Sequence, residues 1–338
     1  MNTQEMIQVG LIGFGGWPRE AYAPVLKDLT NVRVRAVAAR SESTQQLARD
    51  TFTSDIVTTS DYRKLLEDDA LDALMIALPN ALHAQALEDA ADSGKHLFFE
   101  PPVALDAAGA GRVLEKLTGC DRVVHADLEL RSLPVITAMR KHIVAGEIGA
   151  PRMARIRLAC DWGYDRAPWL DEVQNQSFFH WLGHWYLDTL DAVFGQAAER
   201  ASVVGGHARN GTLMDHGWAS LVYPDGAIGQ FEFDLVVPQG TAIDLTVTCE
   251  RGQMDADLRT GAWRHRGASG DWHEASAPAS QPACGFEGMR ESILGFFDTV
   301  RNGGEPPGNL TVVRRVQHAA QLCVDAESIE SRGQRRRQ

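Results

Sequence analysis

The stretch Ile7–Pro18, which reads IQVGLIGFGGWP, decides the fold of this chain. Its first half is short and apolar, as expected of a buried strand that ends at Gly13. Apolar residues then recur with helical spacing, at Ala21, Val25, Leu26 and Leu29. A strand, a glycine-rich turn and a helix in this order form a unit in which backbone N–H groups can approach a pyrophosphate.

Strands and helices continue to alternate beyond this unit. Val32–Arg40 predicts a second strand, which strengthens the nucleotide-binding interpretation of a glycine cluster that ordinary tight turns also use. Further strands are expected near 56–57, at 71–77 and at 96–99, with helices from 42, around 62–66 and at 81–93. This alternation predicts an α/β Rossmann fold with a doubly wound parallel sheet.

The pattern changes after about residue 150, where longer alternating segments predict a C-terminal α+β domain with a large, mostly antiparallel sheet. Its strands are expected at 153–159, 219–223, 227–235 and 244–249, and its helices at 185–194, 288–300 and 313–331. Ala268–Ala283 is rich in Ser, Ala, Pro and Gly and is expected to form a surface loop. We therefore expect a dinucleotide-binding domain at 1–124, a substrate and oligomerisation domain at 125–320, and a helix end with a basic tail at 321–338.

The composition excludes several classes of protein. The 338 residues carry 33 basic and 45 acidic side chains, a net charge of −12, which argues against a nucleic-acid partner. The five cysteines form no C-x-x-C pair, so neither a disulfide framework nor a zinc ribbon is indicated. The N-terminus lacks the features of a secretory signal, and no apolar run is long enough to cross a membrane. We therefore expect a cytoplasmic protein with no membrane partner.

The expected cofactor site begins at the glycine-rich turn. Its residues are Gly13, Phe14, Gly15, Gly16 and Trp17. Pro18 occupies the slot of the usual third glycine, where a first helical turn tolerates proline. The second strand ends in Arg40 and Ser41, without the acid that would bind the ribose 2′-OH of NAD. These two residues suit a 2′-phosphate, so we expect NADP in preference to NAD; the alternative is that Arg40 is a solvated loop residue.

Further motifs complete a family resemblance. They are Pro79-Asn80-Ala81-Leu82-His83, Glu100-Pro101-Pro102, Arg131-Ser132-Leu133-Pro134 and Gly146-Glu147-Ile148-Gly149. With the glycine-rich turn, they resemble the Gfo/Idh/MocA family (glucose–fructose oxidoreductase / inositol dehydrogenase) over residues 7–195. The resemblance implies a nicotinamide cofactor, hydride transfer to or from a small sugar-like or hydroxy/oxo compound, and a homodimer or homotetramer formed through the C-terminal sheet. It adds five expected cofactor-binding residues, which are Pro79, Asn80, His83, Glu100 and Pro101.

Both positions at which this family handles protons are changed here. The family's Glu-Lys-Pro signature reads Glu100-Pro101-Pro102, so the lysine slot has no ionisable group. The family's Asp-x-Gly-x-His-x-x-Asp signature corresponds to residues 181–188, where Trp181 takes the place of the first Asp and Trp185 that of the His. His184 is displaced by one residue, which turns a helical side chain by ~100°.

A relocated acid/base is therefore expected, within ~2.6–3.2 Å of the reacting atom or one water away. We expect it among His184, Tyr186 and Asp188, with His180, Tyr164, Asp165 and His125 as further candidates. For any single one of these side chains structural packing is the favoured explanation, whereas the polar and aromatic cluster as a whole favours a pocket. Flat aromatic faces suit a ring-shaped substrate, and the expected contacts are Arg131, Trp162, Tyr164, Trp169, His180, Trp181 and Trp185.

Two other interpretations follow from the same changes. A catalytically silent NAD(P)-binding regulatory or sensor protein of the same fold would also have lost both proton-handling residues. His180, His184 and Asp188 would share a face and hold a metal only if the whole stretch were helical. No Glu stands beside His180 as in zinc-hydrolase helices, so we expect no metal.

Overall fold

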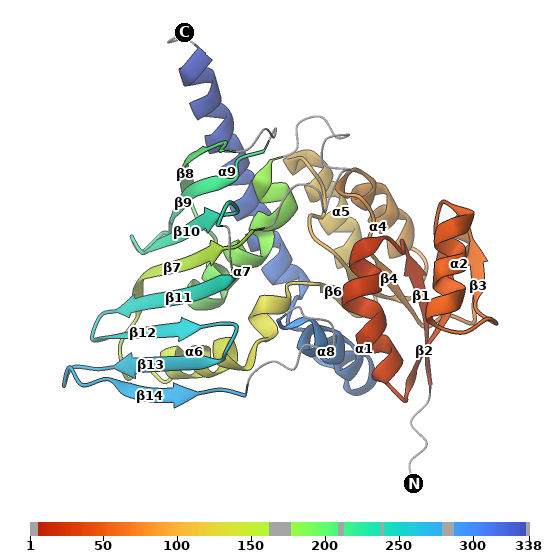
Figure 1. Cartoon of the computed structure of the whole chain (residues 1–338), viewed down its shortest axis with the longest axis horizontal. Helices are drawn as coiled ribbons and strands as arrows, with labels where there is room; N and C mark the ends of the chain where they lie inside the picture. Colours follow the sequence, from red (N-terminus) through yellow and green to blue (C-terminus); the bar gives the residue numbers. More distant parts are fainter. Residues whose placement is uncertain (1–5, 162–176, 209–212, 238–239, 279–286, 336–338) are drawn as a thin grey trace. The chain divides into compact units, whose positions relative to one another are not determined.

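In a computed structural model of the chain, the described residues are 6–161, 177–208, 213–237, 240–278 and 287–335, with only the backbone described for 328–335 (Figure 1). Contacts divide the chain into two units. The first comprises Met1–Leu128 and Gln281–Leu310, and the second comprises Glu129–Ser280 and Thr311–Gln338. Each unit has its own hydrophobic core.

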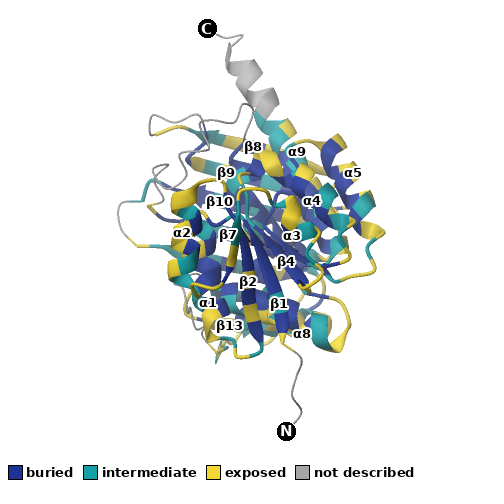
Figure 2. Cartoon of the chain, turned by 90° about the vertical axis from the view of Figure 1, so that its right-hand side faces the viewer, coloured by how far each residue is buried: buried dark blue, intermediate teal, exposed yellow. Residues whose placement is uncertain are grey.

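The first unit contains a six-stranded parallel sheet, which confirms the predicted Rossmann fold. Its strands are β1 (Ile7–Ile12), β2 (Val32–Ala38), β3 (Val57–Thr59), β4 (Ala73–Ile76), β5 (His96–Phe99) and β6 (Val124–Ala126). They lie in the order β3-β2-β1-β4-β5-β6, so the direction of winding reverses between β1 and β4. The central strands β1 and β4 are largely apolar because helices cover both faces of such a sheet, and Figure 2 shows β1, β2 and β4 as mostly buried.

Helices follow the strands of this sheet. They are the π-helix η1 (Pro18–Tyr22), α1 (Ala23–Asp28), α2 (Glu42–Thr51), α3 (Arg63–Leu66), the 3-10 helix η2 (Asn80–Leu82), α4 (His83–Ala91) and α5 (Ala107–Thr118). Ser41 and Asp106 begin α2 and α5, because their side chains accept hydrogen bonds from the backbone N–H groups of Thr44 and Gly109. A late segment, α8 (Met289–Asn302), joins the same core as Tyr22 and Phe98.

The second unit contains an eight-stranded sheet in the order β14-β13-β12-β11-β7-β10-β9-β8. All neighbouring strands are antiparallel except β7 and β10, which confirms the predicted mostly antiparallel sheet. The strands are β7 (Pro151–Ala159), β8 (Arg200–Gly206), β9 (His216–Val222), β10 (Ile228–Asp234), β11 (Ala242–Cys249), β12 (Gly252–Asp257), β13 (Ala262–Arg266) and β14 (His273–Ser276). The expectation of a loop over Ala268–Ala283 is wrong at β14, where the polar edge strand pairs with β13.

Helices cover one face of this sheet. They are η3 (Glu129–Ser132), α6 (Pro134–Val144), η6 (Phe179–Gly183), α7 (His184–Phe194) and α9 (Leu310–Arg335). Alternate residues of β7 and β10, such as Ile156 and Phe231, enter the core with Leu187 and Leu190 of α7. The opposite face carries charge, where Arg157 lies 3.3 Å from both Glu232 and Asp244. Over the described part of the chain, none of the helices has the length and apolar character needed to cross a membrane.

Candidate functional site

The glycine-rich turn after β1 exposes its backbone on one side. Gly13 has a φ of +94°, and a Cβ there would lie 2.1 Å from the carbonyl oxygen of Ala77, so only glycine fits. A Cβ at Gly15 would meet nothing within 4 Å, and one at Gly16 would meet only a side-chain oxygen of Glu20 at 4.0 Å. The residues therefore fit a dinucleotide, whose pyrophosphate needs glycine backbone and open space beside it.

The same turn is tied to the end of β5. Trp17 Nε1 donates a 2.5 Å hydrogen bond to Glu100 Oε1, and the hydroxyl of Tyr22 donates to the same oxygen. Pro18 is the first residue of η1, as its missing N–H allows. Phe14 is buried against Phe52 at 5.6 Å between ring centroids. Glu100 thus anchors Trp17 and Tyr22, which follow the glycines of the turn, to the end of β5.

His83 connects the segments that follow β4 and β5. Its Nδ1 lies 2.8 Å from the carbonyl oxygen of Pro102, and its Nε2 lies 2.6 Å from that of Leu78. Burial lowers the pKa of His83, while the two carbonyl contacts act in the opposite direction. Beside it, Pro79 precedes η2 and the side chain of Asn80 is buried. Pro101 and Pro102 are joined by a cis peptide bond.

The end of β2 presents an arginine and a group of hydroxyls. Arg40 is exposed, and Ser41 caps α2 by accepting a 3.2 Å hydrogen bond from Thr44 N. The hydroxyls of Ser43 and Thr44 lie 3.0 and 2.8 Å from that of Ser41. A cation and hydroxyls at a helix N-terminus suit an anionic group. Ser43 and Thr44 were missed, although the run of small hydroxyl residues after the strand is visible in the sequence.

All these segments follow the carboxyl ends of β1, β2, β4 and β5, which are neighbours in the sheet. Because the winding reverses between β1 and β4, this edge is the switch point at which doubly wound sheets bind nucleotides. The predicted cofactor residues of the first unit are therefore brought to one edge.

A pair of buried carboxyl groups lies below this edge. Glu100 follows β5 and Asp127 follows β6, and both side chains are buried. Burial and the negative charge of Asp127 raise the pKa of Glu100, and burial raises the pKa of Asp127 to about 7. Ser292 Oγ donates a 2.7 Å hydrogen bond to Asp127 Oδ1 and lies 3.1 Å from His125 Nε2. No sequence pattern pointed to Asp127 or Ser292, whereas His125 was one of the further acid/base candidates.

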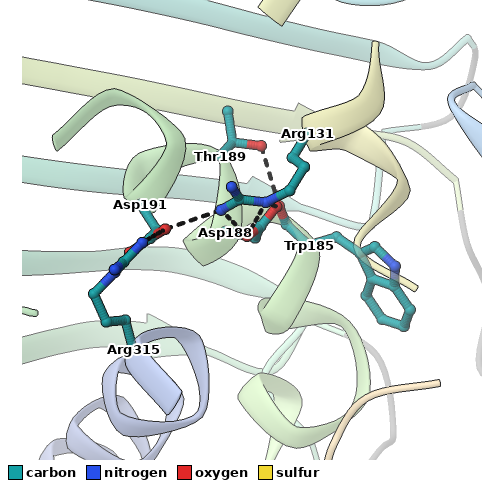
Figure 3. A network of polar contacts seen from close by, with 6 residues as sticks. All are labelled: Arg131, Trp185, Asp188, Thr189, Asp191 and Arg315. Carbon is teal, nitrogen blue, oxygen red and sulfur yellow. Dashed lines mark hydrogen bonds and ion pairs between the residues drawn. The ribbon is translucent and has the colours of Figure 1, made fainter. Parts of the chain in front are cut away.

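In the second unit, Arg131 holds the acids of α7 (Figure 3). Its Nε and Nη2 donate to Asp188 Oδ1 at 2.9 and 2.5 Å, and Nη2 also donates to Asp191 Oδ2 at 2.9 Å. Arg315 donates to the two oxygens of Asp191 at 2.5 and 2.9 Å. Burial raises the pKa of Asp188 to about 6 against the opposing effect of Arg131. The predicted substrate contact Arg131 and the predicted acid Asp188 are thus paired with each other.

The remaining predicted residues lie on η6 and α7. His184 begins α7 and is buried one turn before Asp188, on the same face of the helix. His180 is buried in the π-helical turn Phe179–Gly183, which leads directly into α7. Tyr186 is buried and stacks on Phe231, with 4.8 Å between centroids and 14° between planes.

The tryptophans divide into two groups. Trp181 and Trp185 pack against the core of the second unit, and Thr189 Oγ1 donates a 3.1 Å hydrogen bond to the carbonyl oxygen of Trp185. Trp162, Tyr164, Asp165 and Trp169 lie outside the described residues. Within the described ranges, no group of three or more His, Cys, Asp or Glu side chains is placed to hold a metal ion.

Comparison with protein families agrees with this arrangement. Residues 7–128 match the GFO_IDH_MocA model, described as an oxidoreductase family with an NAD-binding Rossmann fold. Residues 136–255 match the GFO/IDH/MocA C-terminal domain. The two matches fall in the first and second units, respectively.

Individual relatives are distant. The inositol 2-dehydrogenase/D-chiro-inositol 3-dehydrogenase of Lacticaseibacillus casei is 25% identical over 255 residues, which are 74% of this chain and 72% of that protein. A D-xylose 1-dehydrogenase (NADP(+)) of Haloferax volcanii is 30% identical over 141 residues, only 42% of each chain. A structure of levoglucosan dehydrogenase with NADH and levoglucosan has the same fold, with a TM-score of 0.83, 18% identity, and coverage of 96% of this chain and 98% of that one. The consecutive family matches and these relatives show that the chain belongs to the GFO/IDH/MocA oxidoreductase family.

Proposed function

We propose that this chain is an NADP-preferring oxidoreductase that transfers a hydride to or from a small sugar-like or hydroxy/oxo compound. The observation that carries this proposal is the open glycine-rich turn at the switch point, next to a β2 end that has Arg40 in place of an acid. The substrates named for the relatives, an inositol, xylose and levoglucosan, support a sugar-like compound.

The residues of the first unit would hold the cofactor, which when bound supplies or accepts the hydride. The turn Gly13–Trp17 would receive the pyrophosphate, and Arg40 with Ser41 would receive the 2′-phosphate. His83 would keep the segments after β4 and β5 together beneath it, because its ring contacts both Leu78 and Pro102. NADH in the levoglucosan dehydrogenase structure and NADP(+) in the xylose dehydrogenase name mean that relatives use either cofactor.

Hydride transfer to a carbonyl, or from the corresponding alcohol, also needs a group that moves a proton. Neither Pro101 nor Trp185 can do this. Of the predicted acid/base residues, Tyr186 is stacked on Phe231 and Asp188 is paired with Arg131, whereas His184 carries an imidazole, the side chain most often used for general acid/base catalysis. His184 is therefore our choice of acid/base, with the Arg131–Asp188 pair positioning the face of α7 that carries it.

A regulatory or sensor protein that binds NAD(P) without turnover is the second candidate function. The observation in its favour is that Tyr186 and Asp188 are both engaged in packing or pairing inside the second unit. Such a protein would bind the cofactor and respond to a small ligand without oxidising it.

We further propose a homodimer or homotetramer formed through the charged face of the C-terminal sheet. This face also exposes large apolar side chains on neighbouring strands, namely Met153, Val204, Trp218 and Ile228. Mixed charge with apolar groups is typical of a surface that associates with a copy of itself. Sedimentation measurements on the whole chain would test the assembly.

The first experiment is a calorimetric titration of the whole chain with NADPH and with NADH. We expect NADPH to bind more tightly than NADH. Arg40→Ala should weaken the affinity for NADPH at least about tenfold, which corresponds to one charge-assisted hydrogen bond, and should leave the affinity for NADH unchanged. Arg200→Ala on β8 removes another exposed arginine and serves as the matched control. Binding of neither cofactor would refute both candidate functions.

Turnover separates the two functions. The chain would be assayed with NADP⁺ against sugars, anhydrosugars and cyclitols, and in reverse with NADPH against the matching ketones. Turnover that disappears in His184→Ala supports the oxidoreductase with His184 as its acid/base. Tight cofactor binding without turnover across the panel would favour the sensor.

A further inference from the structure

The carboxyl groups of Glu100 and Asp127 are neighbours because of strand register. In the parallel pair β5–β6, Phe99 lies opposite Ala126, so the next positions along the two strands are Glu100 and Asp127. Asp127 N also donates a 2.8 Å hydrogen bond to the carbonyl oxygen of Phe99, which continues the ladder to this point. Two positions earlier on the same face, Phe98 and His125 stack with 5.1 Å between centroids.

Each carboxyl group has its own donors, and these come from different elements. Glu100 Oε1 accepts from Trp17 in the glycine-rich turn and from Tyr22 on η1. Asp127 Oδ1 accepts from Ser292 on α8, and His125 lies beyond that hydroxyl. No donor from another described residue reaches Asp127 Oδ2, and the remaining contact is between the two carboxyl groups themselves.

The charge of this pair is not balanced by a cation. Among the described residues, neither carboxyl forms an ion pair with Lys or Arg, and Pro101 brings no charge next to Glu100. Two carboxylates side by side in a buried space cannot both ionise at low cost, and a hydrogen bond between them requires a proton on one of them. The pair is thus built to hold one proton and one negative charge.

We propose that Glu100 and Asp127 share one proton, and that this proton holds Trp17 and the glycine-rich turn in the form that binds the cofactor. Both acids are positioning residues, since they act on the cofactor through Trp17. The inference rests on the proposed function only for its cofactor; the shared proton is a property of the first unit alone.

The physical link runs through one oxygen atom. With the proton in place, Glu100 can keep its Oε1 toward Trp17 and Tyr22 while its carboxyl group stays against Asp127. When the proton leaves, the two carboxylates repel each other. Glu100 can then move away from Asp127 only by shifting its Oε1, which accepts the hydrogen bonds of Trp17 and Tyr22. Trp17 is the residue next to Gly16, so cofactor affinity falls as the pH rises through the titration of the pair. Within the described ranges, the hydrogen bonds around the pair involve two other titratable groups, Tyr22 and His125.

The test compares Glu100→Gln with the unchanged chain. An amide at this position still accepts from Trp17 and Tyr22, and its NH₂ can donate to Asp127 without a shared proton. Calorimetric NADPH titrations would be made from pH 6 to pH 9, where we expect the affinity of the unchanged chain to fall about tenfold or more relative to Glu100→Gln. The ligand is the same in both, so its own titration cancels. Glu115→Gln, at an exposed acid on α5, is the matched control.

Infrared spectroscopy of the cofactor-free chain provides a readout that needs no cofactor. We expect a C=O stretch of a protonated carboxylic acid near neutral pH, absent from both Glu100→Gln and Asp127→Asn and present in Glu115→Gln. Absence of this band from the unchanged chain would overturn the shared proton. Equal pH dependence of NADPH affinity in the unchanged chain and Glu100→Gln would overturn its coupling to the turn.

The two experiments distinguish a failure of the proposed function from a failure of the shared proton. If neither NADPH nor NADH binds at any pH, the cofactor assignment fails and the coupling to cofactor affinity fails with it. The infrared band would still decide, from the same variants, whether Glu100 and Asp127 share a proton.

Discussion

Arg131 grips the carboxylate of Asp188 through two nitrogen atoms, with Nε at 2.9 Å and Nη2 at 2.5 Å from Oδ1. Both side chains are buried, and the guanidinium also reaches Asp191, so one cation serves two acids on successive turns of α7. The arrangement brings η3 and α7 together, and Arg315 of α9 completes it at Asp191. Removing any one partner from a buried network of this kind leaves a charge buried without compensation, which is strongly destabilising.

Removing the cation should therefore destabilise the second unit. Arg131→Met keeps much of the side-chain volume and leaves Asp188 buried without its partner, so the free energy of unfolding should fall by roughly 3–5 kcal/mol. Denaturant titration followed by circular dichroism measures the change. The exposed pair Arg33–Asp55 offers a control, because Arg33→Met should leave stability nearly unchanged. Equal effects of the two substitutions would contradict the assigned role of Arg131.

His184 and Tyr186 should respond differently to substitution. His184→Ala should lower kcat about a hundredfold or more, the usual loss of a general acid/base, with the dissociation constant of NADPH unchanged. Tyr186→Phe removes only a hydroxyl from a ring that stacks on Phe231, so kcat should change by less than about tenfold. The reverse order of effects would assign proton transfer to Tyr186.

Substitutions at two glycines of the cofactor turn should have different effects, one on folding and the other on cofactor binding. Gly13→Ala places a Cβ 2.1 Å from a carbonyl oxygen at a φ of +94°, so it should destabilise the fold by at least about 1–3 kcal/mol. A Cβ at Gly15 has open space, so Gly15→Ala should leave the midpoint of thermal unfolding unchanged. It should weaken the affinity for NADPH, because its methyl group occupies the side expected to face the pyrophosphate. Thermal unfolding and calorimetry on both variants test this, and unchanged NADPH affinity in Gly15→Ala would move the pyrophosphate elsewhere.

Asp127 should make stability depend on pH in a defined direction. Burial raises its pKa from the ordinary value of 3.8 to about 7 in the folded chain, so between these values the folded state retains a proton that the unfolded state releases. The free energy of unfolding should therefore fall as pH rises across this window, by up to about 1.4 kcal/mol per pH unit from this group, and level off above it.

Asp127→Asn tests this contribution, since an amide does not titrate. The pH dependence of unfolding in Asp127→Asn should be shallower than that of the unchanged chain between pH 5 and pH 7. Asp69→Asn, at an exposed acid, should keep the original slope. Identical slopes in all three proteins would mean that the two carboxyl groups do not hold the proton.

Much of the first unit could be predicted from its sequence, because short apolar strands and helical spacing alternate from Ile7 to Phe99 and the glycine-rich turn marks their beginning. β14 could not, since His273–Ser276 is polar and becomes a strand only by pairing with β13 at the edge of the sheet. β8 was missed for a related reason, as Gly205 and Gly206 weaken its strand pattern.

The candidate site could also be predicted only in part from the sequence. Motif and family resemblance pointed to Glu100 and His83, but not to the contacts that define them. The pairing of Glu100 with Asp127 depends on β5 and β6 being neighbours in register, and Ser292 enters from a helix far along the chain. The π-helical turn η6 (Phe179–Gly183) also has no clear sequence signal, although it leads directly into α7.

The position of α8 has a consequence for how the protein is made. Met289, Ile293, Phe296 and Phe297 complete the core around Tyr22 and Phe98, yet they are translated after every strand of the second unit. A nascent chain that ends before α8 would leave part of this core uncovered, and exposed apolar surface invites misassembly. The first unit begins to leave the ribosome before the second, yet it cannot complete its core until α8 has followed.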